Sequence, residues 1–424
     1  MHEIVIGRSP EDLEKYGTKG TGVIGKHFVG EKRDAYLTNP MRIDLARPHI
    51  IGIFGKRGTG KSHTLGVIAE EIALLPEELN KNMACVIIDP MGIYWSMKNP
   101  NERDITLLSK WGLKPTSFEV QVLVPEGQAR HFTENEIPYD KTFAMRPSEL
   151  DSGSWALTFG IELDTEIGIL LEKTIKIIND NMPSYDLMDL IEVVKKIDAP
   201  SVAKQGLINR FSLAHDWGLF SSVGTSIHDI AVPGKITVLD ISQFGLASGG
   251  WSVRSLVVAL VARRILEERI KSRRLEELQE MEGGKLGAGY MPLTWMLIDE
   301  AHQFLPAEGM TVASGPLLQW VKIGREPGVS LALATQMPYK LHNEAISQCD
   351  LVLAHRLTSR NDIEALANIM QSYMRYSIPE YFDRLPREKG SALILDDNSE
   401  RLYEIRMRPR MSWHAGGSPI AIKD

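Results

Sequence analysis

The glycine-rich segment from Gly55 to Ser62 restricts the possible folds of this chain more than any other stretch. It follows directly on the apolar run Ile50–Phe54, and the next stretch, His63–Leu75, carries apolar residues at the spacing of a buried helix face. Glycines let the backbone curl so that successive N–H groups point inward, while the following helix presents its positive end to the same place. The sequence therefore predicts a strand, an anion-binding turn and a helix in immediate succession.

The residue types within this turn predict which anion it binds. Three glycines followed by Lys61 and Ser62 form a P-loop, the turn that holds the phosphates of a nucleoside triphosphate. In such a turn Lys61 reaches the β- and γ-phosphates, and the Ser62 hydroxyl is a ligand of Mg²⁺. The predicted cofactor-binding residues are Gly55, Lys56, Arg57, Gly58, Thr59, Gly60, Lys61, Ser62 and His63.

An acidic pair follows a second apolar run. The predicted strand Leu293–Ile298 ends in Asp299 and Glu300. Alone, such a pair is usually only the solvated start of a helix, but together with a P-loop it forms the second half of an ATPase site. Asp299 is then expected to hold Mg²⁺ through water, and Glu300 to orient and polarise the attacking water. We therefore predict ATP and Mg²⁺ as cofactors.

Other apolar runs also end in polar residues, as expected of a parallel sheet. The almost wholly apolar strand 84–88 before Asp89 indicates a strand that is covered on both faces, and a further strand, 329–334, ends at Thr335 and Gln336. Ligands collect at the carboxyl edge of such sheets, and Gln336 at that edge can sense the γ-phosphate. The predicted fold class is α/β, with a mostly parallel sheet and helices on both faces.

The chain divides into three predicted parts. Residues 1–46 form a short β-rich N-terminal segment, residues 47–410 an ATPase domain and residues 411–424 a C-terminal tail. Amphipathic patterns between about residues 100 and 230 predict a helical insertion within the ATPase domain.

Composition excludes several classes of protein. The chain has only two cysteines among 424 residues, too few for a disulfide framework, and no cluster with zinc-ligand spacing. No apolar run approaches the roughly 18 residues of a membrane helix, and the first residues do not resemble a signal peptide, so we expect a cytoplasmic protein without a membrane partner. The net charge of -7 confines any DNA contact to a local surface or to the channel of an oligomer.

The motifs, taken together, resemble the HerA family within the FtsK/HerA superfamily of RecA-like motor ATPases. In chain order the predicted strands end in the P-loop, in Asp89–Gly92, in Asp240–Ser242, in Asp299–His302 and in Thr335–Pro338. The resemblance extends from about residue 20 to about residue 416. It implies a RecA-like core, and a hexameric ring that uses ATP to translocate double-stranded DNA as a helicase-type enzyme. It also implies a nuclease partner such as NurA, in DNA repair, DNA end processing or defence.

Two other functions stay open at this point. A HerA-like ring can serve as an ATP-gated assembly platform for an effector protein without moving DNA, and the acidic net charge and short N-terminal segment favour this alternative. A lone nucleotide-binding switch is a third interpretation. Glu300 and Arg325 argue against the switch, because it needs no catalytic residue supplied by a neighbouring subunit.

The resemblance also assigns roles to basic residues. Arg325 matches the family's arginine finger, which reaches the γ-phosphate held by the neighbouring subunit; the alternative is that it pairs with Glu326 or caps a turn. Arg408 and Arg410 either reach toward a neighbouring nucleotide or form a solvated basic end. Four further basic residues are candidates for a DNA-facing pore: Lys340, His342, Arg356 and Arg360. One departure from the family pattern is Ile93, which stands where relatives carry glutamate before Tyr94.

Overall fold

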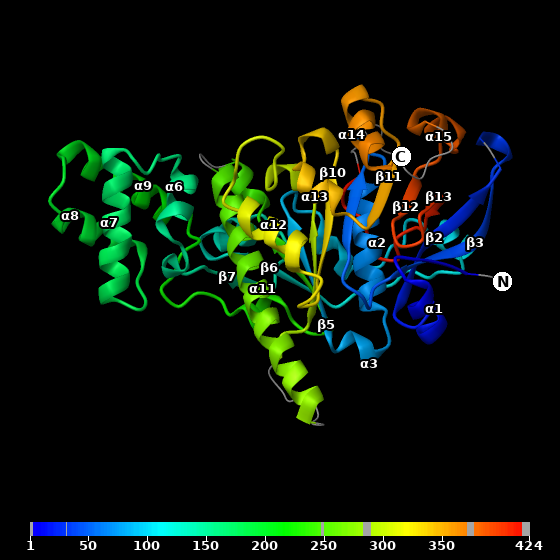
Figure 1. Ribbon diagram of the computed structural model, residues 1–424, viewed down its shortest axis with the longest axis horizontal. Coiled ribbons are helices and arrows are strands. Elements are labelled where there is room, and N and C mark those ends of the chain that lie inside the picture. The colour runs from blue at the N-terminus through cyan, green and yellow to red at the C-terminus, as the bar shows by residue number, and fades with distance from the viewer. Residues whose placement is uncertain (1–2, 31, 247–249, 283–289, 371–376, 418–424) are drawn as a thin grey trace.

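A single 13-stranded mixed sheet organises the protein (Figure 1). The computed structural model describes residues 3–30, 32–246, 250–282, 290–370 and 377–417. The strand order is β1-β3-β2-β13-β12-β11-β4-β10-β9-β5-β8-β6-β7. The strands are β1 (Ile4–Ile6), β2 (Thr21–Val29), β3 (Tyr36–Asp44), β4 (Ile50–Phe54), β5 (Met83–Asp89), β6 (Val120–Pro125), β7 (Lys141–Phe143), β8 (Ile236–Asp240), β9 (Leu293–Ile298), β10 (Val329–Thr335), β11 (Leu351–His355), β12 (Ser391–Asp396) and β13 (Arg401–Met407).

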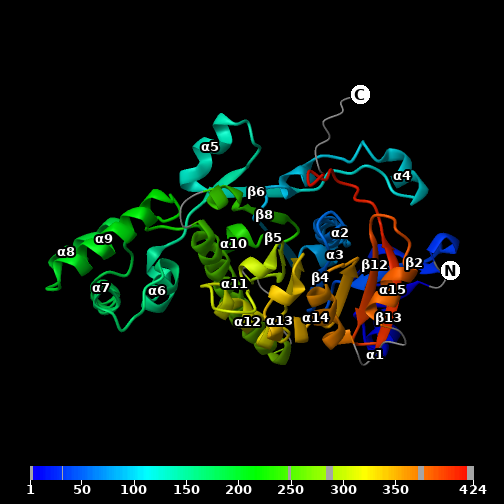
Figure 2. The ribbon, with the colours of Figure 1, turned by 90° about the horizontal axis from the view of Figure 1, so that it is seen from above.

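The half of the sheet that runs from β11 to β7 is parallel throughout. Every residue of β5, β8, β10 and β11 is buried, because helices cover both faces of these strands. One hydrophobic core lies on each face, and Figure 2 shows α2 and α3 on one side and α11 and α12 on the other. The predicted α/β fold with a mostly parallel sheet is confirmed.

The helices connect the strands and cover the sheet. They are α1 (Pro10–Tyr16), α2 (Lys61–Ala73), α3 (Glu77–Asn80), α4 (Ile105–Lys110), α5 (Ala129–Glu134), α6 (Ser152–Phe159), α7 (Glu166–Asn181), α8 (Leu187–Lys196), α9 (Ser201–Asp216), α10 (Ile227–Ile230), α11 (Gly250–Glu282), α12 (Ser314–Ile323), α13 (Asn343–Ser347), α14 (Arg360–Met370) and α15 (Ile378–Arg384). Among the described residues, no helix is both long and apolar enough to cross a membrane.

The other half of the sheet is mostly antiparallel and joins the two ends of the chain. β12 and β13 form a hairpin, and β13 pairs with β2 of the N-terminal segment. β2 in turn pairs with β3, and β1 lies parallel to β3 at the sheet edge. The N-terminal strands thus continue the ATPase sheet, while the division of the chain at residue 46 stays a prediction.

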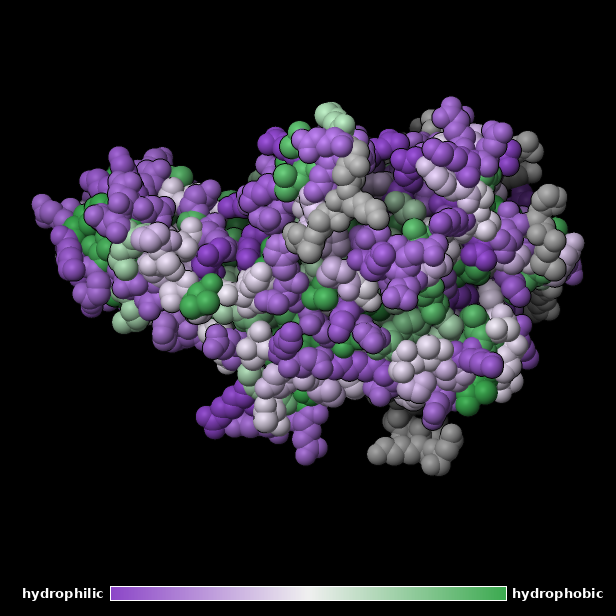
Figure 3. Space-filling view, turned by 90° about the horizontal axis from the view of Figure 1, so that it is seen from below, coloured by the Kyte–Doolittle hydropathy of each residue, from purple (hydrophilic) through white to green (hydrophobic). Residues whose placement is uncertain are grey.

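Helices α6 to α9 form a lobe at one end of the molecule (Figure 1). Its core is aromatic: the Trp155 ring stacks on Phe159 at 5.1 Å and meets Phe211 edge to face at 5.4 Å. In Figure 3 the lobe projects to the left, and its visible surface mixes hydrophilic and hydrophobic residues. The same region of the chain also contributes β6 and β7, which extend the parallel sheet.

The long helix α11 changes character along its length. Its first half is buried from Val253 to Ala262, whereas its second half extends beyond the sheet (Figure 1). Side chains on that second half pair one turn apart, as Arg273 does with Glu277 at 3.1 Å. This agrees with the sequence, which turns from apolar to densely charged at the same point.

Candidate ATPase site

The predicted ATPase residues meet at one edge of the sheet. β10 lies between β4 and β9, all three strands are parallel, and their carboxyl ends are level because Thr335 pairs with Phe54 and Leu333 with Ile298. The P-loop follows β4, the acidic pair follows β9, and Gln336 follows the strand between them. The half-buried Gln336 therefore stands between the phosphate-binding turn and the acidic pair.

The P-loop takes the curled backbone that its glycines permit. Gly58 and Gly60 have φ of 79° and 118°, in the left-handed region where a side chain is strained. Gly60 caps the start of α2, so the free N–H groups of the first helical turn face the loop. The Lys61 Nζ lies 3.3 Å from the Lys56 carbonyl oxygen, and burial lowers the pKa of Lys61 although Glu300 and Asp299 oppose that shift.

Tyr94 connects the two halves of the site. Its hydroxyl lies 3.1 Å from the Asp299 Oδ2 and 3.2 Å from the Ser62 carbonyl oxygen, and the tyrosine side chain is fully buried. The other carboxylate oxygen of Asp299 accepts the Glu300 N–H at 2.9 Å. Asp299 is thereby oriented beside the P-loop serine. Sequence reasoning assigned Tyr94 no role; its place just after the Asp89–Gly92 turn was the one available signal.

Asp89 holds the turn that carries Tyr94. Its carboxylate accepts the backbone N–H groups of residues 91, 92, 93 and 94 at 2.7 to 3.1 Å. Asp240, at the end of the neighbouring strand, is its register partner. Burial and the Asp240 carboxylate raise the pKa of Asp89 to about 8, and the N–H donors of Tyr94 and Ile93 partly offset this rise. Ile93, the residue that departs from the family pattern, takes part in this turn through its backbone N–H.

Glu300, the predicted general base, combines an unusual backbone conformation with a half-buried side chain. Its φ of 50° is unusual for a residue with a side chain, a kind of strain that is concentrated at functional sites. Burial and the neighbouring Asp299 raise its pKa. Its Oε2 is buried and accepts no hydrogen bond from the described part of the chain. A water molecule is the natural partner for this oxygen.

A neutral histidine stands next to Glu300. The Nδ1 of His302 lies 2.9 Å from the Thr335 hydroxyl at the end of β10 and 3.5 Å from the Glu300 Oε2. Burial lowers the pKa of His302 to about 4, so the ring is uncharged near neutral pH. The contact between His302 and Glu300 is therefore not a charged ion pair near neutral pH.

Arg325 lies at the opposite edge of the sheet. It falls between the end of α12 and the start of β10, whereas the P-loop stands at the carboxyl ends of the strands. Its exposed side chain borders a cavity of about 600 Å³ that Arg47, His49 and Asp350 also line. Within the described residues, no ion pair joins Arg325 to Glu326. Arg325 therefore lies away from the P-loop of its own chain.

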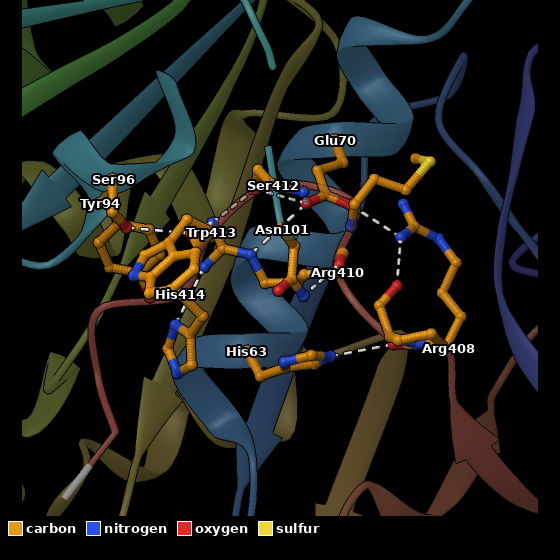
Figure 4. A network of polar contacts seen from close by, with 12 residues as sticks. His63, Glu70, Tyr94, Ser96, Asn101, Arg408, Arg410, Ser412, Trp413 and His414 are labelled. Carbon is orange, nitrogen blue, oxygen red and sulfur yellow. Dashed lines mark hydrogen bonds and ion pairs between the residues drawn. The ribbon is translucent and has the colours of Figure 1, made fainter. Parts of the chain in front are cut away.

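The structure overturns both sequence interpretations of Arg408 and Arg410. These side chains are 1% and 0% exposed and lie along α2 (Figure 4). We call residues 408–415 the C-terminal strap. Arg408 pairs with Glu70 and with Glu71, each at 2.7 Å, and the Arg410 Nε lies 3.5 Å from Glu70. They neither reach a neighbouring nucleotide nor form a solvated end, because buried carboxylates of the P-loop helix bind them.

Further contacts fasten the strap to the P-loop helix. The Ser412 hydroxyl and N–H donate to the Glu70 Oε1 at 2.6 and 2.9 Å. A Cβ atom at Gly66 of α2 would lie 2.7 Å from the Arg410 guanidinium, so glycine leaves the space for this arginine. The His63 ring contacts the Arg408 carbonyl oxygen at 2.9 Å, so the histidine side chain points toward the strap (Figure 4). The backbone N–H of His63, in the first turn of α2, stays at the phosphate-binding turn.

The four candidates for a DNA-facing pore have different surroundings. His342 accepts the Glu344 N–H at the start of α13, and Arg360 forms an exposed pair with Glu364 on α14. The Lys340 Nζ lies 5.8 Å from the centre of the Tyr339 ring. The Arg356 carbonyl oxygen accepts the backbone N–H of Lys56 in the P-loop. Arg356 thus stands beside the nucleotide-binding turn.

Comparison with known proteins identifies the family. Residues 29–268, more than half of the chain, match the family model described as "Helicase HerA, central domain". The chain belongs to the HerA family. HerA proteins are P-loop ATPases of the FtsK/HerA superfamily, so the resemblance inferred from the motifs is confirmed.

One relative and two solved structures illustrate how far the similarity extends. The probable DNA double-strand break repair helicase HerA of Methanocaldococcus jannaschii is 24% identical over 374 residues, which cover 80% of this chain and 65% of that protein. VirB4 of Thermoanaerobacter pseudethanolicus superposes with a TM-score of 0.53 at 14% identity, covering 91% of this chain and 97% of that one. The plasmid coupling protein TrwB in complex with ADP and Mg²⁺ gives 0.52 at 15% identity, covering 98% of each. Both structures share the RecA-like fold.

Proposed function

We propose that this HerA-family protein is a ring-forming motor that hydrolyses ATP and translocates double-stranded DNA. The observation that carries the proposal is the placement of Arg325 at the edge of the sheet opposite its own P-loop. A guanidinium there can complete only a site that belongs to another copy of the chain, which favours a ring, and we propose a hexamer.

The residues at the carboxyl edge fit ATP and Mg²⁺. Residues 55–63 supply backbone N–H groups and Lys61 for the phosphates, and the oxygen atoms of Ser62 and Asp299 are ligands that Mg²⁺ prefers. The bound Mg²⁺ supplies charge neutralisation for the phosphates. Glu300 accepts a proton from the attacking water, consistent with its buried, unpaired Oε2. Gln336 senses the γ-phosphate from the end of β10.

Partner proteins follow from the family rather than from a surface of this chain. The chain spans 65% of the length of its relative from Methanocaldococcus jannaschii, which is described as a probable DNA double-strand break repair helicase. We propose a NurA-like nuclease or another effector protein as partner, in DNA repair or defence. The alternative function is an ATP-gated assembly platform without DNA movement, which the acidic net charge of -7 favours.

The two functions differ in how ATP hydrolysis responds to DNA. We expect the assembled protein to hydrolyse ATP several-fold faster when linear duplex DNA is added, because a motor couples turnover to its track. The measurement is steady-state phosphate release with and without duplex, at low and moderate salt because phosphate contacts weaken as salt rises. Unchanged turnover with duplex, in a protein that does assemble, would favour the platform.

The arginine-finger proposal predicts complementation between two inactive variants. Arg325→Ala is expected to lower the ATPase rate by about 10³-fold, as removal of such a finger does in other P-loop enzymes. Lys61→Ala subunits retain Arg325, so mixing the two variants should restore part of the activity, since some interfaces then combine an intact P-loop with an intact finger.

Lys322→Ala is the matched control for that experiment. It removes a cation that borders the same cavity and pairs with Glu344 at 3.1 Å, and it should leave the rate nearly unchanged. Absence of any restored activity in a mixed, assembled sample would show that Arg325 does not act on a neighbouring site.

A further inference from the structure

The turn that carries Arg325 is short and closes on itself. Residues 324–328, which we call the finger turn, connect the end of α12 to the start of β10. The Gly324 carbonyl oxygen accepts the Val329 N–H at 2.9 Å across this turn. Arg325 and Glu326 are exposed, whereas the other three residues of the turn are buried. The backbone around Arg325 is therefore built into the protein, although its side chain lies outside.

A buried arginine on α11 holds the finger turn from within. The Arg269 side chain is 1% exposed, and its Nε donates to the Pro327 carbonyl oxygen at 2.7 Å. Its Nη1 donates to the Met291 carbonyl oxygen, just before β9, and to the Glu276 Oε1 at 2.9 Å. The Arg269 Nη2 lies 3.4 Å from the other carboxylate oxygen of Glu276. One guanidinium thus joins the finger turn, the segment before β9 and α11.

Both ends of the finger turn are fastened to α11. Figure 2 shows α12 against α11, and the Trp320 Nε1 of α12 donates to the Ala262 carbonyl oxygen at 2.8 Å. At the other end, Gly328 has a φ of 85°, and a Cβ atom there would lie 3.3 Å from the Arg269 Nη2 and 2.3 Å from the Leu293 Cδ2. A side chain at this position would push the turn away from the guanidinium, so glycine permits the close approach.

Arginine is the residue type that these contacts require. Burial of a positive charge is costly unless its charge and its hydrogen bonds are satisfied. The guanidinium is planar and carries donors in fixed directions, whereas a lysine ammonium concentrates its donors on one atom. An arginine can therefore reach the Pro327 carbonyl oxygen with its Nε and the Glu276 carboxylate with its Nη atoms at the same time. The surroundings of Arg269 fit an arginine better than any other cation.

The contact lies close enough to Arg325 to control where its side chain points. Pro327 is two residues from Arg325, and both belong to a turn of five residues. Movement of the Pro327 carbonyl group therefore moves the backbone from which the Arg325 side chain extends. Catalysis is sensitive to such shifts, because a misplacement of about 1 Å caused far from the chemistry can slow a reaction by about 10²-fold.

We infer that Arg269 is a positioning residue for Arg325: it holds the finger turn so that the Arg325 guanidinium enters the ATP site of the neighbouring subunit in one orientation. This inference rests on the proposed role of Arg325 as the arginine finger. Arg269 contacts the finger turn at the edge of the sheet opposite its own P-loop, so it acts on ATP hydrolysis in the neighbouring subunit. Through Glu276 it also links the finger turn to the half of α11 that extends beyond the sheet (Figure 1).

The first measurement separates turnover from ATP binding. Arg269→Lys keeps a positive charge near Glu276 but has no second nitrogen for the Pro327 carbonyl oxygen. We expect kcat to fall by about 10- to 100-fold through loss of orientation, while the affinity for a fluorescent ATP analogue changes by less than about twofold. Arg273→Lys, one turn further along α11, is the matched control, because Arg273 forms a partly exposed ion pair with Glu277 at 3.1 Å. Its kcat should stay within about twofold of that of the unmodified protein.

The second measurement mixes variants to show on which subunit Arg269 acts. Arg269→Lys subunits keep an intact P-loop, and Lys61→Ala subunits keep an intact finger turn, so their mixture should regain part of the ATPase rate. Arg269→Lys and Arg325→Ala both impair the finger turn, so a mixture of these two should regain nothing. A general loss of folding would not follow this pattern. For the same reason, adding Arg269→Lys to Arg325→Ala should slow the rate further by less than about twofold.

The outcomes distinguish this inference from the arginine-finger proposal on which it rests. The inference is overturned if Arg269→Lys keeps a near-normal kcat while Arg325→Ala is inactive, if Arg269→Lys loses ATP affinity as much as turnover, or if its mixture with Arg325→Ala regains activity. Failure of Lys61→Ala to restore Arg325→Ala would overturn the arginine finger itself.

A second variant carries the test should thermal unfolding show that Arg269→Lys does not fold. Glu276→Gln removes the carboxylate charge that holds the Nη atoms of Arg269, and kcat should then fall by about 3- to 10-fold. Lys61→Ala should restore that loss and Arg325→Ala should not. An unchanged kcat in folded Glu276→Gln, or the reverse pattern in the two mixtures, would overturn the inference.

Discussion

Replacing Glu300 with glutamine is expected to abolish ATP turnover while ATP binding is retained. Glutamine keeps the shape of the side chain but cannot accept a proton from water. General bases contribute about 10² to 10⁴-fold to a rate, and we expect a loss in this range. The measurement pairs single-turnover hydrolysis with equilibrium binding of a fluorescent ATP analogue.

A matched variant distinguishes loss of chemistry from loss of binding. Lys61→Ala removes the cation that contacts the phosphates and should weaken binding itself. Asp299 remains oriented in Glu300→Gln, because Tyr94 contacts its Oδ2 and the backbone N–H of residue 300 donates to its Oδ1. Near-normal turnover in Glu300→Gln would show that another group activates the water.

Replacing Glu70 with glutamine is expected to destabilise the fold by about 3 to 5 kcal/mol, the usual cost of removing one partner from a buried ion pair. Glu70 is fully buried and pairs with both Arg408 and Arg410. Without its charge, Arg410 keeps no carboxylate partner among its described contacts, while Arg408 retains Glu71. The measurement is urea unfolding. The control is Glu78→Gln, whose exposed pair with Lys19 should contribute at most about 1 kcal/mol. A loss below 1 kcal/mol in Glu70→Gln would contradict the role given to the strap.

The same ion pairs imply a direction for the pH dependence. Burial raises the pKa of Glu70, but Arg408 and Arg410 lower it by more, so this pKa lies below its ordinary value of 4.5. A carboxylate with a lowered folded pKa contributes stability above about pH 4.5, and this stability is lost as pH falls through the folded value. His63 acts in the same direction, because burial lowers its pKa to about 4 and protonation below about pH 6.5 then favours the unfolded chain.

The sequence predicted those parts of the site that depend on local pattern. The P-loop, the acidic pair and Gln336 each follow directly on an apolar strand, and parallel strands bring such ends to one edge whatever their order. The roles of these residues stay predictions, whereas their meeting at one edge is observed.

Other features depend on contacts between distant segments, which local patterns do not encode. Glu70 and Glu71 resemble the polar face of an ordinary amphipathic helix, and Arg408 resembles part of a solvated tail. Only the contact between Glu70 and Arg408, which are 338 residues apart in the sequence, shows that both side chains are buried. Tyr94 was missed for a related reason, since its hydroxyl meets Asp299 across 205 residues.

The strap has a consequence for how the protein is synthesised. A ribosome delivers the P-loop helix long before residues 408–415, so Glu70 lacks its arginines for most of translation. A chain released before the strap emerges would carry every ATPase motif. The Glu70 carboxylate on its P-loop helix would nevertheless lack Arg408 and Arg410 as partners. We expect such fragments to be less stable than the full chain and to be cleared by proteases.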